Sequence, residues 1–386
     1  MTNLAVIILG LFIAAGKIKD YPALSSILPI DLTILLSILL LSFILIKREK
    51  AFLISRELFI YLPFILVMMI SVIYSPDYYK ALDKTGRFIF LTGLAIISPF
   101  FLLDSYEKIK RFFLTLFVIY FLLSLDSLSM LGSLESDERL TLRGGLTIEL
   151  GVAAVTAILI CIFILLPQTH SLFKKLFLYI IICMLFTALV GSGARSAFIC
   201  LIFGFMINIY FHRKLALDYI LLSIILVVLL LFFIPLPEAS INYLGSLIKN
   251  DTTDLLDWRG HLMQRGIELT LEYPLTGVGI GGFPFYGTIP PPEEWFLYNW
   301  PHNVILEISS EMGILNAILV IIILFLSFKE AIIQTLDTNF KYRDLSQLTL
   351  ALLLVGFITF MNTGDINDNR PMWLYISLPF VLRNLQ

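Results

Sequence analysis

A short break between two apolar stretches combines residue types that bind anions. Residues 191–197 read Gly-Ser-Gly-Ala-Arg-Ser-Ala and contain Arg195 and Ser196. The glycines leave backbone N–H groups accessible, Ser196 is a candidate cap for the next helix, and Arg195 adds a fixed positive charge. This combination favours a phosphate-like anion at a membrane boundary. A short glycine turn with an arginine paired to a lipid headgroup is the structural alternative.

Two further arginines, Arg259 and Arg265, lie in a predicted helix. We expect Asp257 to cap a helix over Trp258–Tyr273 that Pro274 ends. At about 100° per residue, positions six apart point about 120° away from each other. Only one of the two arginines therefore needs to face a binding site.

This helix belongs to a long polar segment, residues 235–303, rich in Trp, Tyr, Arg and His. Such a segment is typical of an active-site cover, and a simple connector is the alternative. Within it, Gly277, Gly279 and Gly282 match the spacing of a dinucleotide-binding loop. No strand is predicted before them, so we exclude a dinucleotide site.

His302 is the strongest candidate for acid–base chemistry. We expect Pro301 in the first turn of a helix, which places His302 at its N-terminal end. The helix dipole there disfavours the imidazolium, so the ring should stay neutral and able to accept a proton. A structural histidine that only makes hydrogen bonds is the alternative.

Other catalytic patterns give little signal. The sequence has no serine nucleophile elbow and no zinc-binding H-E-x-x-H pattern. Residues 365–370, Asp-Ile-Asn-Asp-Asn-Arg, hold two carboxylates that can bind a divalent ion, but we favour an ion-paired loop in which they hold Arg370. The three cysteines lie in apolar runs and are interpreted as buried small hydrophobes.

The elements that must position these residues are membrane-spanning helices. The 386 residues are 59% hydrophobic and 15% charged, against about 45–50% and about 25% in soluble proteins. With a net charge of −2, this composition excludes a nucleic-acid-binding protein. We predict an all-α polytopic protein with 11–12 crossings, residues 1–386 forming one membrane domain. The apolar runs are 4–16, 30–46, 58–74, 88–103, 112–131, 146–166, 176–190, 196–211, 217–234, 304–328, 345–361 and 372–382.

The basic residues predict the orientation in the membrane. With the N-terminus in the cytoplasm, the short loops on that side carry more Lys and Arg than the outer ones. Both termini are then cytoplasmic, and the segment 235–303 faces outward. The first run lacks the basic start and the cleavage site of a signal peptide, so we expect it to be retained.

With these residues in hand, the chain resembles the bacterial O-antigen ligase and O-antigen polymerase superfamily over residues 139–370. The matching features are Arg195 in a Gly/Ser-rich break, Arg259 on an outer helix that ends before Pro274–Gly279, and the pair His302-Asn303 opening the next span. Arg139 matches an earlier arginine of the family, with Arg143 as the adjacent alternative.

The resemblance implies a glycosyltransferase-C-like membrane enzyme of the bacterial inner membrane, with its active site on the outer face. The implied donor is an undecaprenyl-diphosphate-linked oligosaccharide, and the acceptor is a glycan or lipid A-core hydroxyl. Transfer would invert the anomeric centre without a metal ion or cofactor. His302 is the implied base, and Arg195, Arg259 and Arg139 the implied pyrophosphate ligands. Further candidates for substrate binding are Arg265, Asn303, Arg370, Trp258 and Trp300.

Two alternatives stay open. Acidic outer loops favour a polymerase over a ligase, because a ligase accepts the phosphate-rich core of lipopolysaccharide and would profit from a basic surface. A transporter or flippase for lipid-linked sugars is the rival class. It predicts binding charges at mid-membrane on interrupted, repeated helices.

Overall fold

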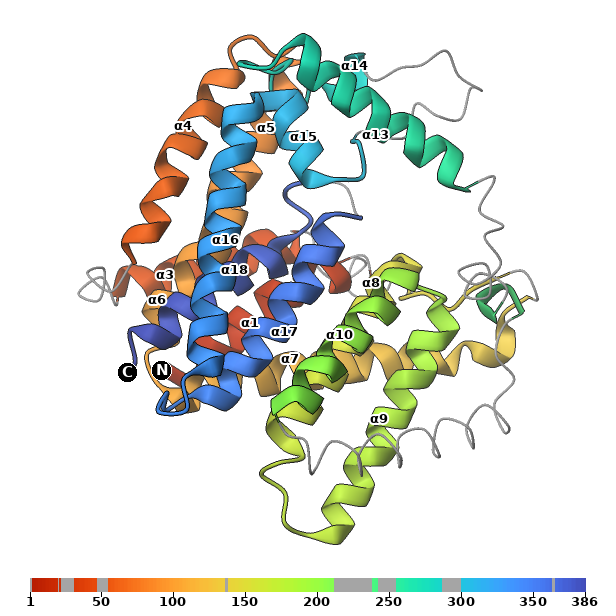
Figure 1. Ribbon diagram of the computed structural model, residues 1–386. Coiled ribbons are helices and arrows are strands. Elements are labelled where there is room, and N and C mark those ends of the chain that lie inside the picture. Colours follow the sequence, from red (N-terminus) through yellow and green to blue (C-terminus); the bar gives the residue numbers. More distant parts are fainter. Residues whose placement is uncertain are drawn as a thin grey trace.

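The structure is a computed structural model that describes residues 2–19, 21, 31–46, 55–135, 138–211, 238–241, 255–286, 300–362 and 365–386 (Figure 1). These ranges are built from helices, with no strand among them. The helices are α1 (Thr2–Ile18), α3 (Leu32–Ile46), α4 (Tyr61–Ser71), α5 (Tyr78–Arg87), α6 (Gly93–Leu102), α7 (Tyr106–Ser129), α8 (Thr147–Ile160), α9 (Leu172–Ser192), α10 (Arg195–Phe211), α13 (Leu255–Glu272), α14 (Phe283–Tyr286), α15 (Val304–Met312), α16 (Ile314–Leu336), α17 (Arg343–Phe360) and α18 (Arg370–Arg383). The π-helical turns η3 (Phe88–Thr92) and η5 (Cys161–Leu165) join α5 to α6 and extend α8.

The apolar runs of the sequence become helices, which confirms the predicted all-α polytopic fold. Six described helical segments are long and apolar enough to cross a membrane, and three further apolar helices are shorter. Every predicted run within the described ranges coincides with one helix or with two consecutive helices. The run at 217–234 lies outside the described residues, so the total of 11–12 crossings stays a prediction.

Two groups of helices pack side by side. Helices α7, α8, α9 and α10 form one group, and α16, α17, α18 and α6 form the other, with α17 in contact with α8 and α10. Trp373 of α18 is fully buried in the second group, edge-on to Phe88 and Phe360. Many large apolar side chains on the outside are exposed, as expected for surfaces that face lipid rather than water.

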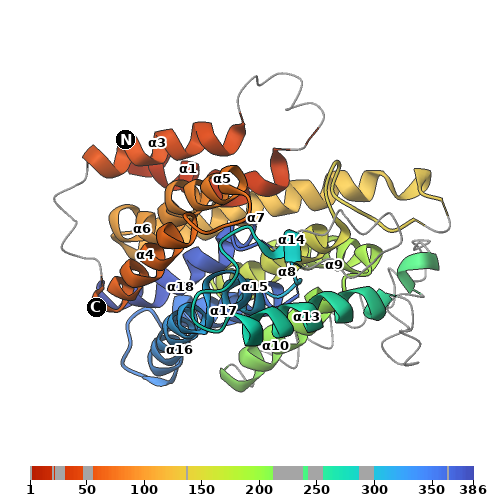
Figure 2. The same ribbon diagram turned by 90° about the horizontal axis from the view of Figure 1, so that it is seen from above.

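The outer segment gathers at one end of this bundle. Helices α13, α14 and α15 lie at the upper end of α16 in Figure 1, whereas α18 ends at the lower end. Seen from above in Figure 2, α13 extends across the upper end, beside α15 and toward α10. At the lower end, Arg383 forms ion pairs with Glu57 and Glu330. Helix α13 and the C-terminal end of α18 therefore lie at opposite ends of the bundle, and the outward position of the segment that carries α13 stays a prediction.

A glycine-rich loop after α13 explains the Gly-x-Gly-x-x-Gly spacing. Gly277 and Gly279 have positive φ angles of 65° and 90°, and the backbone N–H groups of Val278 and Gly279 donate to Ser310 and Glu311 carbonyls at 2.9 Å. A Cβ atom at Gly277 would lie 2.3 Å from the carbonyl carbon of Glu311. The glycines therefore allow the loop backbone to approach the end of α15, and no nucleotide is needed to account for them.

We predict that Gly277→Ala destabilises the protein. The substitution forces a non-glycine residue into a left-handed conformation and against the backbone of α15, at a cost of about 2 kcal/mol or more. Thermal unfolding in detergent should show a clearly lower midpoint. Gly86→Ala is the matched control, because its added Cβ meets nothing within 4 Å inside helix α5. An unchanged midpoint for Gly277→Ala would contradict the close-approach explanation.

Candidate functional site

Three arginines that are far apart in sequence line one cavity. Arg139, Arg195 and Arg259 come from the loop before α8, the start of α10 and α13, and the cavity has a volume of about 400 Å³. Ser196 and Asn362 also line it, and the described lining contains no carboxylate. The cavity therefore concentrates positive charge and hydrogen-bond donors, which is the environment that a phosphate group prefers.

Backbone contacts decide which arginine of the 138–145 loop reaches the cavity. The N–H of Leu140 donates to the Gly191 carbonyl at 2.9 Å, and the Leu140 side chain is fully buried. This contact fixes Arg139 beside the α9–α10 break. Arg143 instead points outward and forms an ion pair with Asp126 at 2.9 Å. The structure thus favours Arg139 over Arg143 as the arginine of the site.

The α9–α10 break presents Arg195 at the start of a helix. Gly193 ends α9 in the left-handed conformation, with φ of 63°. A Cβ atom added at Gly193 would lie 3.2 Å from Cδ of Arg139, so the break and Arg139 are in close contact. Helix α10 begins at Arg195, so the predicted cap at Ser196 is wrong and Ser196 lies in the first turn. Ser192 is the serine of the break that accepts a backbone N–H, from Ala194 at 3.2 Å.

Helix α13 directs Arg259 toward the cavity and Arg265 away from it. The side chain of Arg265 pairs with Glu268 and Glu272 and donates to the Tyr286 carbonyl, so it stabilises the outer segment rather than the cavity. Arg259 therefore lines the cavity and Arg265 does not, which agrees with the expected divergence of the two positions around the helix.

The boundaries of α13 correct one prediction and confirm another. The helix begins at Leu255, so Asp257 lies inside it and is not its cap. It ends at Glu272, just before Pro274, as predicted. Trp258 lies in its first turn, and its side chain is outside the described residues.

Helix α13 packs on α15, and this contact brings Arg259 close to His302. The hydroxyls of Thr270 and Ser309 are 2.9 Å apart, and a Cβ at Gly266 would lie 3.2 Å from Pro301. The small residue at 266 lets the two elements approach closely. As a result, Arg259 and His302 lie near each other although they are 43 positions apart in the chain.

His302 lies just before α15 rather than inside it. The helix begins at Val304, and Asn303 is its N-cap, accepting the Leu306 N–H at 3.1 Å. The expected place of Pro301 in the first turn is therefore wrong, and the substrate-binding candidate Asn303 is occupied as a cap. His302 itself has a φ of 53° and lies edge-on to the ring of Trp300, with centroids 6.1 Å apart.

Burial, followed by the positive charge of Arg259, lowers the pKa of His302 to about 4. The ring is therefore neutral at physiological pH, as expected, although the main cause is burial and not the helix dipole. His302 is not among the residues that line the arginine cavity, but it is near enough to Arg259 to feel its charge. A neutral imidazole beside an arginine cluster is suited to accept a proton near a bound anion.

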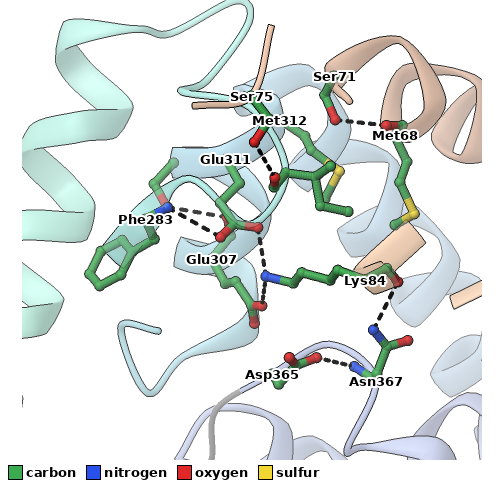
Figure 3. Close-up of polar contacts among 12 residues, drawn as sticks. Met68, Ser71, Ser75, Lys84, Phe283, Glu307, Glu311, Met312, Asp365 and Asn367 are labelled. Atoms are coloured by element: carbon green, nitrogen blue, oxygen red, sulfur yellow. Dashed lines mark hydrogen bonds and ion pairs between the residues drawn. The ribbon is translucent and has the colours of Figure 1, made fainter. Parts of the chain in front are cut away.

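Sequence reasoning missed a buried ion-pair cluster on α15, the helix that follows His302 (Figure 3). The Lys84 ammonium of α5 lies 2.6 Å from a Glu307 carboxylate oxygen and 2.7 Å from one of Glu311, and the three side chains are at most 8% exposed. Glu311 also accepts the Phe283 N–H of the glycine-rich loop, at 3.4 Å. The sequence did contain one signal for this cluster. Glu307 and Glu311 are four residues apart in an apolar run, which places them on the same face of a helix.

Arg370 belongs to a different place in the fold. It is buried at the start of α18, beside Phe12 and Gly16 of α1, and lines another cavity. The expected ion pairs with Asp365 and Asp368 are not formed among the described residues, although Asp368 lies near enough to attract Arg370 electrostatically. Asp365 instead accepts the Asn367 N–H at 2.7 Å. Within the described ranges no cluster of three potential metal ligands is found.

The fold and the site define an all-α polytopic membrane protein with an arginine-lined cavity near one face. Residues 179–321 match the family model described as O-antigen ligase, which confirms the resemblance to the O-antigen ligase and O-antigen polymerase superfamily. The matched range includes Arg195, Arg259 and His302. A search of curated proteins gave no match. The family match supports a membrane glycosyltransferase of the O-antigen ligase type.

We predict that Lys84→Met destabilises the protein strongly. Removing the ammonium leaves two carboxylates buried without their counter-charge, which costs about 3–5 kcal/mol. The triple variant Lys84→Met, Glu307→Gln, Glu311→Gln should recover much of this loss, because it removes the buried charges together. Thermal unfolding midpoints of the two variants in detergent provide the comparison. Equal destabilisation by both variants would contradict a dominant role for the buried charges.

Proposed function

We propose that the protein transfers an oligosaccharide from an undecaprenyl diphosphate carrier to a sugar hydroxyl at the outer face of the bacterial inner membrane. The observation that carries the proposal is the convergence of Arg139, Arg195 and Arg259 on one cavity, with a neutral His302 close to Arg259. The match to the O-antigen ligase model supports the same reaction class.

The reaction requires stabilisation of a diphosphate leaving group. The acceptor oxygen forms a bond to the anomeric carbon while the bond from that carbon to the phosphate oxygen breaks, and the configuration inverts. Negative charge then develops on the diphosphate, which leaves with its lipid. The guanidinium groups of the cavity provide charge-assisted hydrogen bonds where this charge appears.

The acceptor hydroxyl must lose its proton during the attack. His302 is the proposed base, because its neutral ring accepts the proton and becomes an imidazolium. Arg259 connects the two functions, since it lines the cavity and also lowers the pKa of His302. Trp300, edge-on to His302, is a candidate to contact a sugar.

The transfer assay that tests this function also separates polymerase from ligase. Purified protein receives the lipid-linked oligosaccharide, with and without lipid A-core, and the products are sized. Because the outer loops of the sequence are acidic, we expect longer glycans on the lipid carrier. Product attached to core alone would overturn the polymerase preference. Donor movement across vesicles without any new glycosidic bond would favour the flippase and overturn the transferase.

We predict that His302→Ala lowers the transfer rate by about 10²–10⁴-fold, the usual contribution of a general base. In the unmodified protein, kcat/KM should stay level through neutral pH and fall as the pH drops through about 4, where His302 becomes protonated. The donor should still bind to His302→Ala, as measured by titration of the folded variant. Full transfer by a folded variant that binds donor would remove His302 from the reaction.

We predict that Arg195→Gln and Arg259→Gln each lower kcat/KM by about 10–100-fold, since each loses charge-assisted hydrogen bonds worth about 1.5–3 kcal/mol. Arg259→Gln should also move the acid limb of the pH profile to higher pH, because loss of its positive charge raises the pKa of His302. Arg143→Gln is the matched control, as this exposed arginine pairs with Asp126 away from the cavity. Unchanged kinetics in both test variants would contradict the diphosphate assignment.

A further inference from the structure

A second, larger cavity lies on the side of α3. Its volume is about 770 Å³, and it is bounded by α3, by the continuous α5–η3–α6 segment and by the connection between α17 and α18. None of its described lining residues is shared with the arginine cavity. The function proposed above does not use it.

One part of this cavity is an apolar groove open to the side. Ile34, Ile38 and Leu41 follow one another along α3, and Phe90 and Ile97 face them from η3 and α6. Ile38 is 58% exposed and Phe90 is 69% exposed. In a membrane protein such side chains contact lipid, so the groove opens toward the bilayer.

The other part is polar and contains Arg370. This arginine is only 8% exposed, and its Nη1 atom is buried with no hydrogen-bond acceptor in the part of the chain that the structure describes. The guanidinium lies over the Phe12 ring, 5.6 Å from its centroid. A buried Nη1 atom without an acceptor is costly, and an anionic ligand in the cavity would satisfy it.

The charged groups of the lining balance, with three cations and three carboxylates. Arg87 and Asp83 pair with each other at 3.0 Å. Asp31 accepts the Thr33 N–H at 2.6 Å, at the start of α3. Lys19 and Arg370 share this end of the cavity with Asp31 and Asp368, and no described ion pair joins these four side chains. The observation that indicates an anionic ligand is therefore the unsatisfied Nη1 atom of Arg370, which a singly charged group such as a phosphodiester would satisfy.

The length of the groove limits the chain of the ligand. Seven residues separate Ile34 from Leu41 and Phe90 from Ile97, which corresponds to about 10 Å along each helix. One leaflet of the hydrocarbon core is about 15 Å thick, half of the full core. The groove therefore matches a chain within a single leaflet.

We propose that this cavity binds one glycerophospholipid of the outer leaflet, with its phosphodiester at Arg370 and Lys19 and one acyl chain between α3 and α6. The site is independent of the arginine cavity. Its occupant is a bound lipid and not the sugar donor.

Native mass spectrometry of the delipidated full-length protein in detergent tests the proposal, with phosphatidylglycerol as the probe. We expect one tightly bound lipid. Arg370→Gln should weaken its binding at least tenfold, and Ile38→Trp, which fills the apolar groove from an exposed position, should do so as well. Arg143→Gln and Ile322→Trp are matched controls outside the cavity and should bind like the unmodified protein.

The competing ligands give distinct outcomes. Diacylglycerol, which lacks the phosphate, should bind much more weakly, and equal binding would overturn the role of Arg370. Tighter binding of undecaprenyl phosphate than of phosphatidylglycerol would overturn the assignment to a glycerophospholipid. If Arg370→Gln does not fold, the test relies on Ile38→Trp. Unchanged lipid binding by Ile38→Trp would overturn the proposal. Because binding is measured without transfer, these results do not depend on the proposed activity.

Discussion

The ion pairs between Lys84 and the two glutamates of α15 are the interaction on which the site depends. Two carboxylates and one ammonium are removed from solvent, so they stay stable only while they remain in contact. This contact ties α5 to α15, and Glu311 extends it to the glycine-rich loop through the Phe283 N–H. Helix α15 in turn supports α13 through the Thr270–Ser309 hydrogen bond. The positions of His302 and Arg259 therefore rest on this cluster.

The sequence was sufficient to predict the elements and the residue types of the site, because both are local properties. Apolar runs predicted the helices, Pro274 predicted the end of α13, and helical periodicity predicted that Arg259 and Arg265 diverge. The first residue of each helix was harder to predict from the sequence. Asp257 and Ser196 are good capping residues by type, yet the chain begins each helix earlier, and α13 and α10 are held by tertiary contacts that outweigh a single cap.

Long-range pairing could not be read from the sequence. Lys84 and Glu311 are 227 residues apart, and no local pattern indicates that they meet. The same limit applies to Arg370, whose place near the last span suggested a substrate role, while the packing of α18 on α1 directs it to another cavity. Among the arginines, Arg139 and Arg143 are adjacent candidates in the sequence. The Leu140–Gly191 backbone contact and the Arg143–Asp126 ion pair distinguish them.

Gly313 separates the short helix α15 from the long apolar helix α16. Its φ of 84° and ψ of 161° interrupt the helix, so α15 leans away from the axis of α16 (Figure 1). A span must adjust its tilt to the thickness of the bilayer around it. Because Gly313 interrupts the helix, the direction of α15 is set by its contacts with α5 and α13 as well as by its packing on α16. It follows that a tilt of α16 in a thicker or thinner membrane need not be passed on in full to His302.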